Sequence, residues 1–151
     1  MNKRYNMSKK HDPKMHSAEH LLNQAMVSKF GCNRCFSAHI NKKKSKCDYN
    51  FDRPLTGLEI KELQETVNQQ IEKNHSVIIE MVSKEVAQNQ FNIERVPEKE
   101  GLNKLRIVCI GEYDACPCIG PHVSSTKEIG KFKITTTGFE DGVLRIRFKL
   151  L

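Results

Sequence analysis

The amino-acid sequence predicts an α+β fold: a two-layer sandwich with an α-β2-α core followed by two or more strands, its helices lying on one face of a mainly antiparallel sheet. Three observations lead to this prediction. Apolar residues recur every three or four positions in residues 12–30 and again in residues 56–74, as in amphipathic helices. Alternating apolar and polar residues predict two strands between these helices and several after them. This order of elements is typical of α+β domains.

The first predicted helix has clear signals at both ends. Asp12 is a favourable N-cap, Pro13 suits the first helical position, and Gly31 is placed to end the helix. One apolar stripe comprises Ala18, Leu21, Leu22, Ala25 and Met26. His16 and His20 lie one turn apart, roughly opposite this stripe. This position argues against the interpretation that the two histidines are ordinary core residues. They are either exposed surface histidines or metal ligands, and the positive N-terminal end of the helix favours the neutral imidazoles that bind metals.

The later elements follow from similar patterns. Thr56 and Glu59 form a predicted capping box for the second helix, whose stripe contains Ile60, Leu63, Val67 and Ile71. Strands are expected at residues 35–40, 47–51, 77–81, 105–109, 132–134 and 144–150, and a short helix at 83–90. Turns are expected at residues 41–46 and at Gly138, Asp141 and Gly142, a polar loop at 96–103, and a functional loop at 112–128. The last strand alternates apolar residues on its inner face with Arg145, Arg147 and Lys149 on its outer face.

Length and composition fit a single domain at residues 12–151, preceded by a basic, mobile lead-in at residues 1–11. No apolar run approaches the roughly 18 residues of a membrane span, and no secretory signal is recognisable, so we expect a cytoplasmic protein without a membrane partner. In a reducing cytosol, the six cysteines indicate metal binding rather than disulfides. The net charge of +7 gives weak support for a polyanionic partner, RNA above all.

A second pair of metal-binding residues lies about 100 positions after the first pair. Cys118 and His122 flank a Gly-Pro segment, and together with His16 and His20 they make a donor set suited to one tetrahedral zinc ion. Cys116 is an alternative to Cys118 as the thiolate ligand. A different site, held by the four thiolates of Cys32, Cys35, Cys116 and Cys118, would make the protein a non-catalytic RNA-binding module. Cys47 and Cys109 are interpreted as buried small hydrophobic residues.

Several segments in register carry a resemblance to a known family. HSAEHLL, FSAHI followed by CDYNFDRPLT, VNQQI, RIVCIGEYD and CIGPHVSSTKEIGKFKI run from about Met15 to the C-terminus. They resemble the editing domain shared by alanyl- and threonyl-tRNA synthetases, which also exists free-standing as the AlaX proteins. The chain is similar to the short free-standing form. The resemblance implies an α+β fold, zinc bound by His16, His20, Cys118 and His122, and hydrolysis of mischarged aminoacyl-tRNA in trans.

The resemblance also sets expectations about the substrate. Ser-tRNA(Ala) is the favoured substrate, with Gly-tRNA(Ala) next, although the CIGPH segment is nearer the threonyl branch and keeps Ser-tRNA(Thr) as an alternative. No side chain is identified as catalytic, and we hypothesise that a zinc-bound water attacks the ester. Ser37, His39 and Asp114 are candidate substrate contacts. The candidate tRNA phosphate contacts are Lys42, Lys43, Lys44, Lys46, Arg145 and Arg147.

Overall fold

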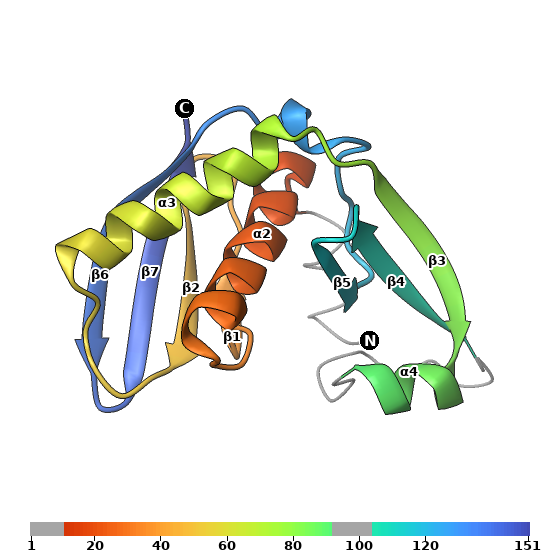
Figure 1. The fold of residues 1–151 in the computed structure, drawn as a ribbon, viewed down its shortest axis with the longest axis horizontal. Helices are drawn as coiled ribbons and strands as arrows, with labels where there is room; N and C mark the ends of the chain where they lie inside the picture. Colours follow the sequence, from red (N-terminus) through yellow and green to blue (C-terminus); the bar gives the residue numbers. More distant parts are fainter. Residues whose placement is uncertain (1–10, 92–103) are drawn as a thin grey trace.

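The computed structural model describes residues 11–91 and 104–151, and its first element is helix α2, Pro13–Phe30 (Figure 1). The predicted caps are confirmed. Oδ2 of Asp12 accepts a hydrogen bond from the backbone N–H of Met15 at 3.0 Å. Gly31 has a left-handed φ of 68° and donates its N–H to the carbonyl of Val27 at 2.9 Å. A residue without a Cβ adopts this φ without strain, so the chain leaves the helix at a defined position.

The strands form two antiparallel sheets. The four-stranded sheet has the order β1-β2-β7-β6, and the three-stranded sheet has the order β3-β4-β5. Their bounds are β1 Ser37–His39, β2 Ser45–Asn50, β6 Phe132–Glu140 and β7 Val143–Leu150, then β3 Val77–Ser83, β4 Lys104–Ile110 and β5 Asp114–Pro117. The predicted α+β class is therefore confirmed. The division into two sheets is a feature that the patterns of single strands did not predict, because it depends on which strands pair.

The main core lies between the four-stranded sheet and the helices α2 and α3, Gly57–Glu72, on one of its faces (Figure 1). Strand β7 alternates as predicted, with Leu144, Ile146 and Phe148 fully buried. Helix α3 begins with the predicted capping box of Thr56 and Glu59, and it contributes Leu63, Val67 and Ile71 to the core. Cys47 is also fully buried in this core, as predicted, whereas Cys109 on β4 is partly buried.

Helix α2 is buried on more than one face because it lies between the two sheets (Figure 1). Its apolar stripe packs into the main core, and β5 of the second sheet lies along the other side. His16 and His20 are therefore only 4% and 3% exposed. The alternative that these are exposed surface histidines is wrong.

A few boundaries differ from the predicted ones. The predicted functional loop contains strand β5 and a short 3-10 helix, η1, Thr126–Ile129, and Gly138 lies within β6 rather than in a turn. Strand β1 is shorter than residues 35–40, and Phe36 is exposed. The predicted short helix is α4, Lys84–Gln90, capped by Ser83. The polar loop at 96–103 and residues 1–10 of the lead-in lie outside the described residues. No helix in the described part of the chain is long and apolar enough to cross a membrane.

Candidate metal centre

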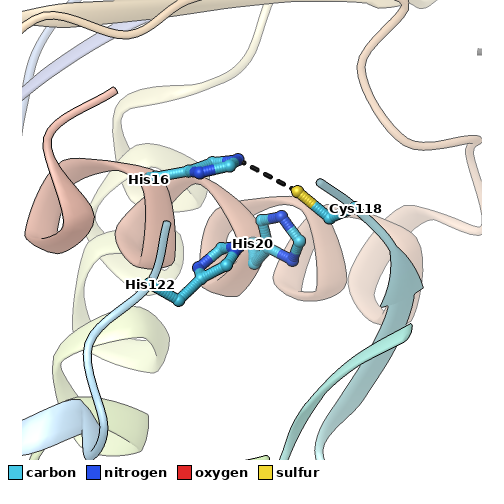
Figure 2. Close-up of side chains that lie close together, drawn as sticks. All are labelled: His16, His20, Cys118 and His122. Carbon is cyan, nitrogen blue, oxygen red and sulfur yellow. Dashed lines mark hydrogen bonds between the residues drawn. The ribbon is translucent and has the colours of Figure 1, made fainter. Parts of the chain in front are cut away.

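Four metal-binding side chains from two distant segments meet beside helix α2 (Figure 2). His16 and His20 come from the first half of α2, Cys118 directly follows β5, and His122 lies in the segment between β5 and η1. One ligand atom from each residue lies within 4.8 Å of the ligand atoms of the other three. The structure therefore brings together the four residues that the sequence predicted as one donor set.

The segment that carries Cys118 is held in place by strand β4. Nη1 of Arg106 donates hydrogen bonds to the carbonyls of Cys118 at 2.9 Å and Gly120 at 2.8 Å. The backbone N–H of Cys118 donates in return to the carbonyl of Arg106 at 3.1 Å. These bonds continue the pairing of β4 with β5, so the thiol is positioned by a strand rather than by a free loop.

His16 is oriented by a backbone carbonyl. Its Nδ1 lies 3.1 Å from the carbonyl oxygen of Pro121. A carbonyl can only accept a hydrogen bond, so Nδ1 carries the hydrogen, and in a neutral ring Nε2 keeps its lone pair. This Nε2 lies 3.3 Å from the Cys118 sulfur, as Figure 2 shows. A ligand histidine that donates its other ring N–H to a carbonyl is the usual arrangement at protein metal sites.

The other two histidines have buried ring nitrogens without hydrogen bonds. Nδ1 of His122 lies 2.9 Å from Oγ of Ser17, which also accepts from the N–H of Val123, whereas Nε2 of His122 has no partner among the described residues. Nδ1 of His20 is also without a hydrogen bond there and faces Oδ2 of Asp114 at 3.6 Å. Buried polar atoms without partners are rare and costly in proteins. A bound cation that takes the Nε2 lone pair of His122 would account for the first of them.

The electrostatics of the cluster also suit a cation. Burial would raise the pKa of the Cys118 thiol, but the neighbouring imidazoles of His122, His16 and His20 outweigh burial and lower it to about 2. Burial and the charge of His20 lower the pKa of His122 to about 3, which keeps its imidazole neutral. Burial alone would lower the pKa of His20, yet the Asp114 carboxylate and the Cys118 thiolate raise it well above its usual value. The cluster therefore stabilises a positive charge between its donors, and a metal ion can supply that charge.

Asp114 lies behind His20 and is bound by an arginine that the sequence did not single out. Its side chain is 1% exposed, and its two carboxylate oxygens accept hydrogen bonds from Nη1 and Nη2 of Arg34 at 2.7 and 3.3 Å. Burial would raise the pKa of this carboxyl, but His20 and Arg34 lower it. The pair places a fixed negative charge beside His20. A carboxylate behind a ligand histidine orients the ring and raises its basicity.

Three further neighbours of the cluster were missed. Ser17 contacts His122, and Glu19 lies 3.6 Å from Nε2 of His16. His11, assigned to the lead-in, packs edge-on against His16 with ring centroids 4.9 Å apart. Spacing on the helix could have indicated Glu19, because it lies three positions after His16. No sequence signal indicated Arg34.

The remaining predicted contact residues lie on the four-stranded sheet and are not among the four donors. Ser37 and His39 are on β1, opposite Asp48 and Lys46 of β2, and His39 is exposed. Lys42, Lys43 and Lys44 are exposed in the turn between β1 and β2. Lys46 on β2 is paired in register with Arg147 on β7, and Arg145 on β7 is paired with Asp48 on β2. Arg145 is bound to Asp48, with Nε to Oδ1 at 2.8 Å and Nη2 to Oδ2 at 2.9 Å, whereas Arg147 is exposed.

The alternative site of four thiolates is wrong. Among residues 11–91 and 104–151, Cys32 and Cys116 belong to no cluster of three or more donors, and Cys35 groups with Glu19 and Cys47 instead. The Cys116 thiol donates to the carbonyl of Pro117 at 3.4 Å. The thiol that lies with the three histidines is that of Cys118.

The fold and the site define an α+β domain with a candidate metal centre on the helix between its two sheets. Residues 105–147 match the family described as the threonyl and alanyl tRNA synthetase second additional domain. The chain is 32% identical over 133 residues to an alanine–tRNA ligase of Bdellovibrio bacteriovorus, and the match covers 87% of this chain and 15% of that protein. An alanine–tRNA ligase of Petrotoga mobilis is 36% identical over 135 residues, covering 88% of this chain and 15% of the ligase.

A third relative, an alanine–tRNA ligase of Aeropyrum pernix, is 34% identical over 113 residues, which cover 74% of this chain and 13% of that protein. The chain therefore spans only a small part of the length of the curated relatives that it matches. It belongs to the family of the second additional, editing-type domain of alanyl-tRNA synthetases.

Proposed function

We propose that the protein hydrolyses mischarged aminoacyl-tRNA in a zinc-dependent reaction, with Ser-tRNA(Ala) as the favoured substrate and Gly-tRNA(Ala) as the next. The observation that carries this proposal is the convergence of His16, His20, Cys118 and His122 within 4.8 Å of one another. The matched relatives are named alanine–tRNA ligases, which supports a substrate built on tRNA(Ala). A cytoplasmic location belongs to the same proposal.

A second hydrolytic site is useful because of the limits of binding discrimination. A pocket shaped for alanine cannot strongly exclude serine, since one tolerated hydroxyl group gives only about a hundredfold discrimination. An editing site must instead accept the larger or smaller wrong amino acid and cleave it from the tRNA. The Gly-Pro-His of residues 120–122 keeps Ser-tRNA(Thr) as the alternative substrate.

The donor chemistry favours zinc over other common ions. Zinc accepts imidazole nitrogen and thiolate sulfur in tetrahedral sites, whereas magnesium and calcium prefer oxygen ligands. When bound, zinc would supply a Lewis acid next to the scissile ester. The chain itself orients the ligands: the carbonyl of Pro121 orients His16, Ser17 orients His122, and Asp114 lies behind His20.

Four protein ligands usually close a zinc site, so a non-catalytic, zinc-stabilised RNA-binding module is the second candidate function. The test is hydrolysis of Ser-tRNA(Ala), Gly-tRNA(Ala) and Ser-tRNA(Thr), each with and without a chelator, together with zinc quantification in the purified protein. We expect release of amino acid from at least one mischarged tRNA, and loss of that activity on chelation. Inertness towards all three substrates in zinc-loaded protein would favour the non-catalytic module.

The basic outer side of the four-stranded sheet is the proposed contact surface for tRNA phosphates. The turn between β1 and β2 presents Lys42, Lys43 and Lys44 to solvent, and Arg147 is exposed on the neighbouring β7. Arg145 is the weakest of the candidates, since its guanidinium is already paired with Asp48. The turn is therefore the part of this surface with cations most available for phosphates.

Reversing the charges of Lys43 and Lys44 to glutamate is expected to weaken tRNA binding and to reduce its salt dependence. The slope of log K against log salt concentration is negative, and each lost phosphate contact makes it less steep by about 1. Binding titrations at several salt concentrations measure this effect. The matched control reverses Lys61 and Lys73, which are exposed on and just after α3 and make the same change in net charge. Equal weakening by both double variants would contradict a specific role of the turn.

A further inference from the structure

Glu19 is a buried carboxylate beside the four donors that the proposed function does not yet use. It lies three residues after His16 and one before His20, so its side chain shares the face of α2 that carries His16. The residue is 9% exposed, and its Oε1 lies 3.6 Å from Nε2 of His16. The same Nε2 lies 3.3 Å from the Cys118 sulfur. Oε1 therefore reaches the side of His16 on which the donors meet.

The two oxygens of the Glu19 carboxylate have different surroundings. Oε2 accepts hydrogen bonds from Nδ2 of Asn23 at 3.1 Å and from the Cys35 thiol at 3.5 Å. The Asn23 amide is held in this orientation because its Oδ1 accepts from the N–H of Cys35 at 3.1 Å and from the hydroxyl of Tyr49 at 2.8 Å. These contacts hold Oε2 on the core side and direct Oε1 toward the donors.

The position of Glu19 suits a role in chemistry more than a role as a ligand. The four donors form a group of their own, and Glu19 groups with Cys35 and Cys47 instead. The order His16, Glu19, His20 on one helix matches the HxxEH pattern of a class of zinc hydrolases, and in the related HExxH enzymes the glutamate is the general base. Glu19 is held through Oε2, and its Oε1 is directed at the donor cluster. A general base requires this arrangement, because it must be fixed in position with one oxygen left to accept a proton.

We propose that Glu19 accepts the proton of the water that cleaves the aminoacyl ester, a role that rests on the proposed deacylase function. A water O–H bond breaks, its proton passes to Oε1 of Glu19, and the water oxygen bonds to the ester carbonyl carbon. The bond between that carbon and the terminal ribose oxygen then breaks, and the proton passes from Glu19 to that ribose oxygen. The products are the free amino acid and tRNA with a free terminal hydroxyl, and no other reactant is consumed.

The test compares Glu19→Gln with the wild-type protein in three measurements: zinc content and affinity, binding of the mischarged tRNA, and the rate of hydrolysis. Glutamine keeps the shape and can still accept the hydrogen bonds of Asn23 and Cys35, but it cannot take up the proton. We expect unchanged zinc affinity and tRNA binding, with kcat lower by about 10²–10⁴-fold. Glu62→Gln makes the same chemical change on the exposed side of α3 and serves as the control with wild-type kcat.

The possible outcomes distinguish failure of the proposed role of Glu19 from failure of the proposed deacylase function. Glu19→Gln with zinc bound and kcat within about threefold of wild type overturns the role of Glu19 but leaves the deacylase function standing. Loss of zinc from Glu19→Gln overturns it in favour of a role in ligand positioning. Inert wild-type protein overturns the proposed function, and the role of Glu19 with it. Should Glu19→Gln unfold, Glu19→Asp decides instead, because a retained carboxylate is expected to keep zinc and a measurable part of kcat.

Discussion

Replacing Cys118 by serine is expected to abolish the proposed zinc binding and to lower the rate of the proposed ester hydrolysis by more than about 100-fold. The reason is that a thiolate is a far stronger zinc ligand than a hydroxyl group, and changes even to residues behind the ligands cost about 10–100-fold in metal affinity or activity. The Cys118 sulfur lies 3.3 Å from His16, within the donor cluster. Zinc content and hydrolysis of mischarged tRNA are the measurements.

Cys116→Ser is the matched control for this prediction. Cys116 lies two residues away on β5, and burial raises the pKa of its thiol, so it stays protonated and bonded to the carbonyl of Pro117. We expect this variant to keep both zinc and activity. Zinc retained in Cys118→Ser but lost in Cys116→Ser would contradict the prediction and show that Cys116 is the thiolate ligand.

Replacing Arg34 by methionine is expected to lower the free energy of unfolding by about 3–5 kcal/mol. Methionine keeps much of the apolar stem of Arg34 but removes the guanidinium that binds both oxygens of Asp114. The Asp114 side chain is 1% exposed, so its carboxylate would stay buried with only His20, 3.6 Å away, as a partly compensating group. We also expect about 10–100-fold weaker metal binding, because Asp114 lies behind His20. Denaturant unfolding and zinc titration measure the two effects.

Two comparisons separate a buried-charge effect from a general loss of packing. In Arg34→Met the Asp114 carboxylate stays buried without its arginine partner. The double variant Arg34→Met with Asp114→Asn also removes this negative charge, and it is expected to recover part of the stability. Arg53→Met breaks a similarly bidentate pair with Glu59 on the exposed surface, where ion pairs contribute little, so its effect is expected to be much smaller. A loss in Arg34→Met no larger than in Arg53→Met would contradict the prediction.

The Arg34 effect is also expected to depend on pH with a definite sign. Burial opposes ionisation, yet His20 and Arg34 lower the pKa of Asp114 below its ordinary value of 3.8. A carboxyl whose folded pKa is lowered stabilises the protein above its unfolded pKa, and this contribution is lost as the pH falls through the folded pKa. The stability difference between wild type and Arg34→Met should therefore be full at neutral pH and shrink in acid.

Local signals predicted those parts of the fold that depend on near neighbours in the chain. The caps of α2, the capping box of α3 and the inward face of β7 all appeared where expected. Each depends on residues within a few positions of one another, so a short stretch of sequence contains the whole signal. Strand β5 was missed because it has only four residues and a proline at its end.

The polar side of α2 shows why a correct helix can be assigned the wrong surroundings. Ser17, Glu19 and Asn23 look like residues of a solvated face, yet all three are buried. They are tolerated there because each has hydrogen-bond partners from other segments: Val123 for Ser17, Cys35 for Glu19, and Tyr49 for Asn23. Periodicity detects apolar residues, and it cannot detect polar residues that find partners far along the chain.

From the sequence came the identity and spacing of the four donors, the helix that carries two of them, the thiol and imidazole of the other two, and the family resemblance. Only the tertiary structure established that the two segments meet, that Cys118 and not Cys116 lies with the histidines, and that Glu19, Arg34 and His11 surround them. The physical reason is that the donor cluster forms where β5 packs along α2, and packing between segments so far apart in the chain is not encoded in any local pattern.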